Sequence, residues 1–175
     1  VALVVGVDSS TQSTKLELRD ATTGRLQGSA RAAHPPVFPP RSEQDPAAWW
    51  DAFGRAAGNL GRQPVDALAI GGQQHGMVVL DARGSVVRPA KLWNDTESAP
   101  DAADLVERLG AEFWSRAVGS VPVASYTVTK LAWLRRCEPE AWARLARVLL
   151  PHDWLNLTCT GVAATDRGDA SGTGY

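Results

Sequence analysis

The chain has 175 residues, of which 44% are hydrophobic and 21% charged, and its formal net charge at pH 7 is −1. These values are typical of one soluble globular domain, and a charge near zero argues against attraction to nucleic acid or to an anionic membrane surface. No cationic stretch precedes an apolar one at the start of the sequence, so we expect a cytoplasmic protein rather than a secreted one.

The first twenty residues predict two strands joined by a short polar turn. Residues 1–7 form a valine-rich run that is too short to span a membrane and ends at Asp8. Hydroxyl-bearing residues and Lys15 follow, and residues 16–19 alternate between apolar and charged side chains, as in a strand with one solvated face. Such a turn can present N–H groups and hydroxyls to a phosphate. The alternative is an ordinary hairpin with a polar turn.

The next segments predict a third strand, a loop and a helix. Residues 25–33 read as a strand that returns beside the second one, and the proline-rich residues 34–40 cannot form a helix or a central strand. We expect His34 to be an exposed loop residue. A helix should begin at Pro46, because proline suits the first helical position. One apolar face of this helix should pack on a sheet; it comprises Trp49, Phe53, Ala56 and Leu60.

The remaining residues alternate between short strands and helices. We expect strands at 65–70, 77–80 and 148–150, and helices at about 100–109, 111–117, 129–136 and 139–145. The two cysteines, Cys137 and Cys159, lack the spacing of a metal site or a redox pair, so we expect both to be reduced and buried.

Two short motifs in this part of the chain bring together glycine, polar and aromatic residues. Gly-Gly-Gln-Gln-His-Gly at 71–76 follows a predicted strand; its glycines permit close approach of the backbone, and Gln74 and His75 offer donors and acceptors for hydroxyls. In Leu-Trp-Asn-Asp at 92–95 an indole is followed by an amide and a carboxylate, which together offer an apolar face and hydrogen-bonding groups. The alternative for His75 is a structural histidine after a strand.

Taken together and in order, these segments resemble the FGGY family of carbohydrate kinases over essentially the whole chain. The resemblance is carried by Asp8 with its hydroxyl-rich turn, by the motifs at 71–76 and 92–95, by Ser-Tyr-Thr-Val-Thr-Lys-Leu-Ala-Trp at 125–133, and by Thr165-Asp166 with Asp169-Ala170-Ser171-Gly172-Thr173. It implies an α/β fold of the ribonuclease H-like, actin-type ATPase class. It also implies transfer of the γ-phosphoryl group of ATP, with Mg²⁺, to a ketopentose, of which D-xylulose is the expected one.

The resemblance also implies roles for individual residues. Asp8 is expected to hold Mg²⁺ as a catalytic residue. The expected ATP-phosphate residues are Thr11, Gln12, Ser13 and Lys15. The expected sugar residues are Gln74, His75, Trp93, Asn94 and Asp95. The chain departs from the family at Ser10, where the family usually has glycine, and at Glu97, where it usually has arginine, so an ion pair made by that arginine is expected to be absent or reversed.

We expect residues 1–175 to be part of the N-terminal kinase domain and to be inactive alone. The resemblance places the general-base aspartate and the adenine site beyond Tyr175. The partners are expected to be the sugar and ATP. The sequence leaves open whether the protein forms a homodimer. Two alternatives remain: a kinase for another sugar or polyol, and a non-catalytic nucleotide-binding module of the same fold. Nucleic-acid binding through Arg135, Arg136, Arg144 and Arg147 is disfavoured, because these residues read as solvated helix faces.

Overall fold

The computed structural model describes all 175 residues, and the chain divides into two compact units. Unit 1 comprises Val1–Pro36 and Ala47–Gln73, and unit 2 comprises Val37–Pro46 and Gln74–Tyr175. None of the helices has the length and apolar character needed to cross a lipid bilayer.

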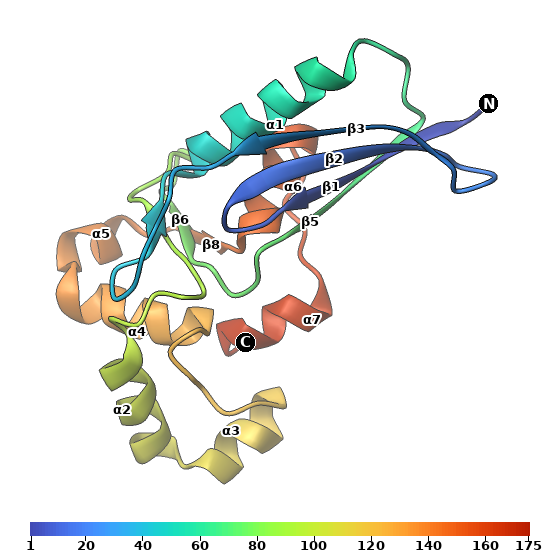
Figure 1. The fold of residues 1–175 in the computed structure, drawn as a ribbon. Coiled ribbons are helices and arrows are strands. Elements are labelled where there is room, and N and C mark those ends of the chain that lie inside the picture. Colours follow the sequence, from blue (N-terminus) through green and yellow to red (C-terminus); the bar gives the residue numbers. More distant parts are fainter. The chain divides into compact units, whose positions relative to one another are not determined.

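Unit 1 is built on a four-stranded sheet with the strand order β3-β2-β1-β5. Strands β1 (Leu3–Ser9), β2 (Ser13–Asp20) and β3 (Leu26–Ala33) run antiparallel, which confirms the expected opening of the fold. Strand β5 (Ala67–Gly72) lies parallel to β1, after the helix that follows β3 along the chain (Figure 1).

The helix α1 (Pro46–Leu60), whose residues after Pro46 belong to unit 1, covers one face of this sheet. Its Ala52 and Ala56 pack with Val5, Val7 and buried leucines of β2, and Phe53 and Leu60 complete the cluster. The predicted apolar face is thus confirmed for these residues. Because side chains alternate along a strand, Asp8 and Lys15 point from the opposite, exposed face.

The expectation that His34 is an exposed loop residue is wrong. His34 directly follows β3, where its N–H donates to the Gln12 carbonyl at 2.8 Å, and the residue is only 6% exposed. Its Nε2 lies 2.9 Å from the Thr14 hydroxyl oxygen, and burial lowers the pKa of the imidazole. The strand pairing continues one residue further than the composition indicated, and this carries the ring into the interior.

Unit 2 contains two small antiparallel sheets surrounded by helices. Strand β4 (Glu43–Gln44) pairs with β7 (Ala90–Lys91), and β6 (Val78–Leu80) pairs with β8 (Arg147–Leu149). The helices are α2 (Ala99–Leu109), α3 (Ala111–Val118), α4 (Thr127–Cys137), α5 (Pro139–Arg144), α6 (Pro151–Thr160), α7 (Arg167–Ala170) and a final 3-10 turn (Ser171–Thr173). Each expected helix of this half is present, with bounds shifted by one or two residues.

The core of unit 2 forms around Met77, Val79, Trp133 and Leu134. Both cysteines lie outside it. Cys137 is the last residue of α4, Cys159 lies in the last turn of α6, and both side chains are exposed. The expectation that the cysteines are buried is therefore wrong, because both fall on solvent-facing positions near helix ends.

Candidate functional site

The end of β1 in unit 1 presents Asp8 on an open surface. Asp8 pairs across the sheet with Lys15 of β2 on one side and with Gly71 of β5 on the other. Neither Gly71 nor Gly6, two residues before Asp8, places a side chain on this face. The exposed carboxylate therefore has room for a hydrated cation and a phosphate chain, and a hard oxygen ligand is what Mg²⁺ prefers.

The turn after Asp8 is held by its own hydrogen bonds. The Ser10 N–H and hydroxyl both donate to the Ser13 carbonyl, at 3.0 and 3.2 Å. The Thr11 hydroxyl donates to Gln73 Oε1 at 3.3 Å, while Gln12 lies exposed at the tip. A turn fixed in this way orders its polar groups before a ligand arrives, which lowers the entropy cost of binding.

Cationic side chains lie beside this turn. Ser13 is buried, and its hydroxyl oxygen accepts a hydrogen bond of 2.8 Å from Nε of Arg31 on β3. Arg31 is the cross-strand neighbour of Lys15, whose ammonium lies 2.6 Å from Glu17. Because the Lys15–Glu17 pair is exposed, breaking it for a phosphate would cost little. Sequence reasoning missed Arg31; only the strand register brings it to the turn.

In unit 2 the two predicted sugar-binding motifs lie next to each other. The Met77 N–H donates to the Lys91 carbonyl at 2.8 Å, and this bridge joins the Gln74–Gly76 loop to the start of the 92–95 motif. His75 has a positive φ of 55°, an uncommon conformation for a residue with a side chain. Its carbonyl accepts a 3.0 Å hydrogen bond from Thr127, and its ring centroid lies 4.6 Å from that of Tyr126. Gln74 is exposed.

Within the 92–95 motif the tryptophan is exposed and the aspartate is buried. Trp93 is 48% exposed, whereas Asp95 is only 1% exposed. Asp95 accepts hydrogen bonds from the Ser42 N–H and from Lys91 Nζ, both at 2.9 Å, and from the Glu97 N–H at 3.1 Å. Asn94 Oδ1 is buried without a hydrogen bond from the protein. Trp93 is therefore better placed than Asp95 to meet a ligand directly, and Asn94 keeps an amide oxygen that accepts no hydrogen bond from the protein.

A buried lysine accounts for the acidic residue at position 97. Lys91 is fully buried, and its ammonium lies 2.6 Å from Glu97, 2.9 Å from Asp95 and 3.2 Å from Glu43. It also lies 3.9 Å from the ring centroid of Trp133. The three carboxylates are grouped closely enough to hold a metal ion, but the ammonium occupies the position between them. An ion pair is thus present at position 97, but with the acidic partner there and the cation, Lys91, six residues earlier. Its charges are reversed relative to those expected with arginine at position 97.

The structure thus assigns the predicted residues to two groups, each within one unit. Asp8, Thr11, Gln12, Ser13 and Lys15 lie together in unit 1. Gln74, His75, Trp93, Asn94 and Asp95 lie together in unit 2.

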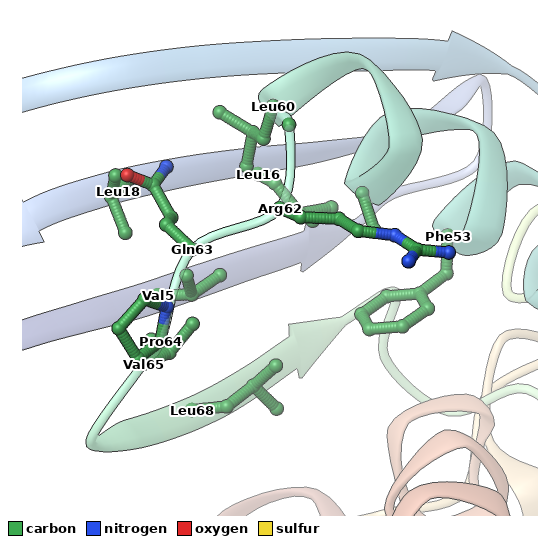
Figure 2. Close-up of a pocket in the computed structure, with 12 residues that line it drawn as sticks. Val5, Leu16, Leu18, Phe53, Leu60, Arg62, Gln63, Pro64, Val65 and Leu68 are labelled. Atoms are coloured by element: carbon green, nitrogen blue, oxygen red, sulfur yellow. The ribbon is translucent and has the colours of Figure 1, made fainter.

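Two apolar cavities, one in each unit, contain none of these residues. A cavity of about 560 Å³ in unit 1 lies between α1, β5 and the loop that joins them, with Phe53, Leu60 and Leu68 in its wall (Figure 2). It opens on the α1 side of the sheet, the face opposite to Asp8. A cavity of about 760 Å³ in unit 2 is lined by residues that include Leu131, Leu149 and Tyr175. The candidate sites are thus polar surfaces and not these cavities.

Comparison with known proteins gives one consistent result. Residues 3–175 match the model of a protein family described as "FGGY family of carbohydrate kinases, N-terminal domain". Xylulose kinases of Streptomyces coelicolor and Streptomyces rubiginosus are 54% and 53% identical over 176 residues, covering 99% of this chain and 37% of each relative. The crystal structure of xylulose kinase from Bifidobacterium adolescentis matches with a TM-score of 0.91 and 45% identity, over 99% of this chain and 40% of that one. The chain therefore spans little more than a third of the length of these proteins.

Proposed function

The chain belongs to the FGGY family of carbohydrate kinases, and on that basis we propose that it is part of an ATP-dependent kinase that phosphorylates D-xylulose. The observation that carries the proposal is the 54% identity to a xylulose kinase over 99% of this chain. The α/β fold of the actin-like sugar kinases, expected from the sequence, is confirmed by the structural match. The reaction would consume ATP and a ketopentose in the cytoplasm.

Unit 1 would supply the phosphate side of this reaction. Asp8 would hold Mg²⁺ through its exposed carboxylate, and the turn formed by Thr11, Gln12 and Ser13 would hold phosphate oxygens. Bound there, Mg²⁺ would offset the negative charge of the triphosphate. Lys15, together with the neighbouring Arg31, would add positive charge beside the turn. Positioning and charge neutralisation are the main contributions a protein makes to phosphoryl transfer.

Unit 2 would supply the sugar side. His75 and Gln74 would bind sugar hydroxyls, and Trp93 would pack on the C–H face of the sugar, with Asn94 beside it. Asp95 would support the site without touching the sugar, because its oxygens already accept hydrogen bonds from Ser42, Lys91 and Glu97. We therefore propose that Asp95 orients the Trp93–Asn94 segment and does not contact the sugar.

We further propose that residues 1–175 form part of the N-terminal domain of a longer kinase. This fits the coverage of 37% of the length of the Streptomyces relatives. The base that accepts the proton of the sugar hydroxyl, and the adenine site, would then lie in the rest of that protein. In the experiments below, the full-length kinase means that longer protein.

A substrate panel tests the proposal. The full-length kinase would be assayed for ADP formation with D-xylulose, other pentuloses, hexoses and glycerol, each against a blank without sugar. We expect D-xylulose to give the highest kcat/KM, because the chain is 54% identical to a xylulose kinase over 99% of its length. A higher kcat/KM for glycerol, or ADP formation that no sugar increases, would contradict the proposal.

A further inference from the structure

His75 is held by contacts on several sides, and the shortest of them is with Asp169, which lies 94 residues later in the chain. Asp169 of α7 is 7% exposed, and its Oδ1 lies 2.7 Å from Nδ1 of the His75 ring. The same oxygen accepts a 2.9 Å hydrogen bond from the His75 backbone N–H. A single carboxylate thus contacts both the main chain and the ring of one residue.

The rest of the surroundings keep the ring in this orientation. A Cβ atom added to Gly172 would lie 2.5 Å from His75 Nδ1, so only glycine fits beside the ring there. Tyr126 packs on the ring, and Thr127 donates to the His75 carbonyl. Asp166 in turn accepts a 2.9 Å hydrogen bond from the Asp169 N–H, which fixes the carboxylate relative to the helix start.

The short contact determines which ring nitrogen carries a proton. A carboxylate oxygen and an unprotonated ring nitrogen both present lone pairs, and at 2.7 Å they would repel each other. Nδ1 must therefore be protonated, even though its N–H direction is not aligned on the oxygen as in a linear hydrogen bond. Nε2, which has no hydrogen bond from the protein, is left as the nitrogen that a ligand can reach.

We propose that Asp169 is a positioning residue that keeps the His75 proton on Nδ1 and leaves Nε2 to accept a hydrogen bond from a sugar hydroxyl. The part that concerns the sugar rests on the function proposed above. The part that concerns the ring proton rests on the geometry alone. Asp169 acts through His75 and touches neither substrate.

A second imidazole lies beside Asp169. His152 lies at the start of α6, with Nε2 2.8 Å from Asp166 and 3.1 Å from Asp153, and with Nδ1 3.6 Å from Asp169 Oδ2. The contact with Asp153 raises the pKa of His152 despite its burial. No lysine or arginine forms an ion pair with Asp169, and its two ion-pair partners are the imidazoles of His75 and His152.

The first test observes the ring proton directly. The full-length kinase would be prepared with ¹⁵N in its histidine rings, and the His75 signals would be identified by their loss in His75→Gln. We expect long-range ¹H–¹⁵N correlations to show a proton on Nδ1 across the pH range and a bare Nε2 at high pH. A neutral ring with its proton on Nε2, the form that free histidine favours, would overturn the proposal. This measurement needs no substrate, so it decides the geometry even if D-xylulose is not phosphorylated.

The second test is kinetic. Asp169→Asn keeps the shape of the side chain but removes the charge, and we expect the kcat/KM for the sugar to fall roughly tenfold to a hundredfold, mainly through KM. The KM for ATP and the melting temperature should stay close to those of the unmodified protein.

Asp166→Asn is the matched control for the second test, since it removes a charge from the same segment without touching His75 and keeps a side chain able to cap the helix; its sugar KM should change much less. An unchanged sugar KM in Asp169→Asn, or equal losses for sugar and ATP together with a lower melting temperature, would overturn the positioning role.

Discussion

At the scale of single residues, Lys91 combines full burial with an unusual density of acidic partners. Taking a lysine ammonium out of water costs several kcal/mol, and the cost is recovered only when its hydrogen bonds are satisfied. Here Asp95 and Glu97 accept from it, Glu43 lies 3.2 Å away, and the face of Trp133 adds a cation–π contact. The same carboxylates fix the segment that presents Trp93, so the ion cluster links stability to the candidate sugar site.

Replacing this lysine should therefore be severely destabilising. In Lys91→Met the carboxylates would stay buried without their cation, and we expect the free energy of unfolding to fall by about 3–5 kcal/mol. The control is Lys15→Met, which removes an exposed ion pair and should cost less than about 1 kcal/mol. Denaturant unfolding of both variants checks the prediction, and equal losses would show that the cluster does not stabilise unit 2.

A second buried lysine gives stability a pH dependence. Lys130 is fully buried, and burial lowers its pKa to about 7 from 10.5, although its ammonium donates to the Ala124 and Ser125 carbonyls. Between these two pH values the unfolded chain binds more protons than the folded one, so stability should rise with pH across that window. Below about pH 7 Lys130 is protonated in both the folded and the unfolded chain, so the full cost of burying its charge lowers the stability of the fold.

The variant Lys130→Met tests this sign. We expect unmodified protein to gain stability relative to Lys130→Met as the pH is raised from 7 to 10, because each unit of pKa shift corresponds to about 1.4 kcal/mol. The measurement is the free energy of unfolding of both proteins at intervals of one pH unit. Parallel curves would mean that Lys130 titrates alike in the folded and unfolded chains.

Sequence reasoning proposed roles for the polar residues of the turn and of the two motifs, but it did not reveal the contacts that support them. Asp8 and His75 stand out because a strand end and a glycine-flanked loop are visible in the sequence. Arg31 does not stand out, and Asp169 is visible only as part of a family motif, because the contacts of these two residues join positions 18 and 94 residues apart. The acidic residue at 97 was noticed, but its partner six residues earlier could be recognised only once both side chains were placed.

At the scale of elements, the approach of two segments in unit 2 depends on one glycine. A Cβ atom added to Gly76 would lie 2.6 Å from Cγ of Pro151, the first residue of α6, and 3.4 Å from the Lys91 carbonyl oxygen. The proline ring is rigid and the carbonyl belongs to β7, so neither can move aside easily. Gly76 therefore lets the start of α6 pack against the loop that carries His75.

Gly76→Ala should accordingly lower the free energy of unfolding by about 1–3 kcal/mol, as overpacked substitutions do. Gly58→Ala in α1 is the matched control, because nothing lies within 4 Å of its added Cβ. In a helix that exchange should raise stability by about 0.5–1 kcal/mol. Thermal or denaturant unfolding of the pair would contradict the argument if both variants shifted in the same direction.

The elements themselves could be predicted well where the chain gives local signals. Pro46 and the following apolar face located α1, and alternation located β2, because period and capping are encoded within a few residues. The two errors, His34 and the cysteines, concern burial at the ends of elements. Burial there depends on which neighbouring strand or helix covers the residue, and local composition does not contain that information.

At the scale of the whole molecule, the predicted phosphate and sugar residues divide between the two compact units. The sequence predicted both sets and their family, because several motifs occur in family order along the chain. It treated the 175 residues as one domain; the division into units follows from long-range packing, which periodicity does not reveal. The division has a functional consequence: changes in unit 1 should alter phosphoryl transfer, and changes in unit 2 should alter sugar binding.

We propose that Asp8 in unit 1 serves phosphoryl transfer, and the variant to examine is Asp8→Asn in the full-length kinase. The amide keeps the size of the side chain and most of its hydrogen bonding but loses the charge that would hold Mg²⁺. The paired variant is His75→Ala, in which sugar binding should weaken by about 1–3 kcal/mol while nucleotide binding is retained.

The decisive measurement is kcat of Asp8→Asn at saturating Mg²⁺, ATP and D-xylulose, together with the sugar Kd without nucleotide and the melting temperature. We expect kcat to collapse while sugar affinity and melting temperature stay near those of the unmodified protein. A kcat close to the unmodified value, with a lower melting temperature, would contradict it, because Asp8 would then only stabilise the turn.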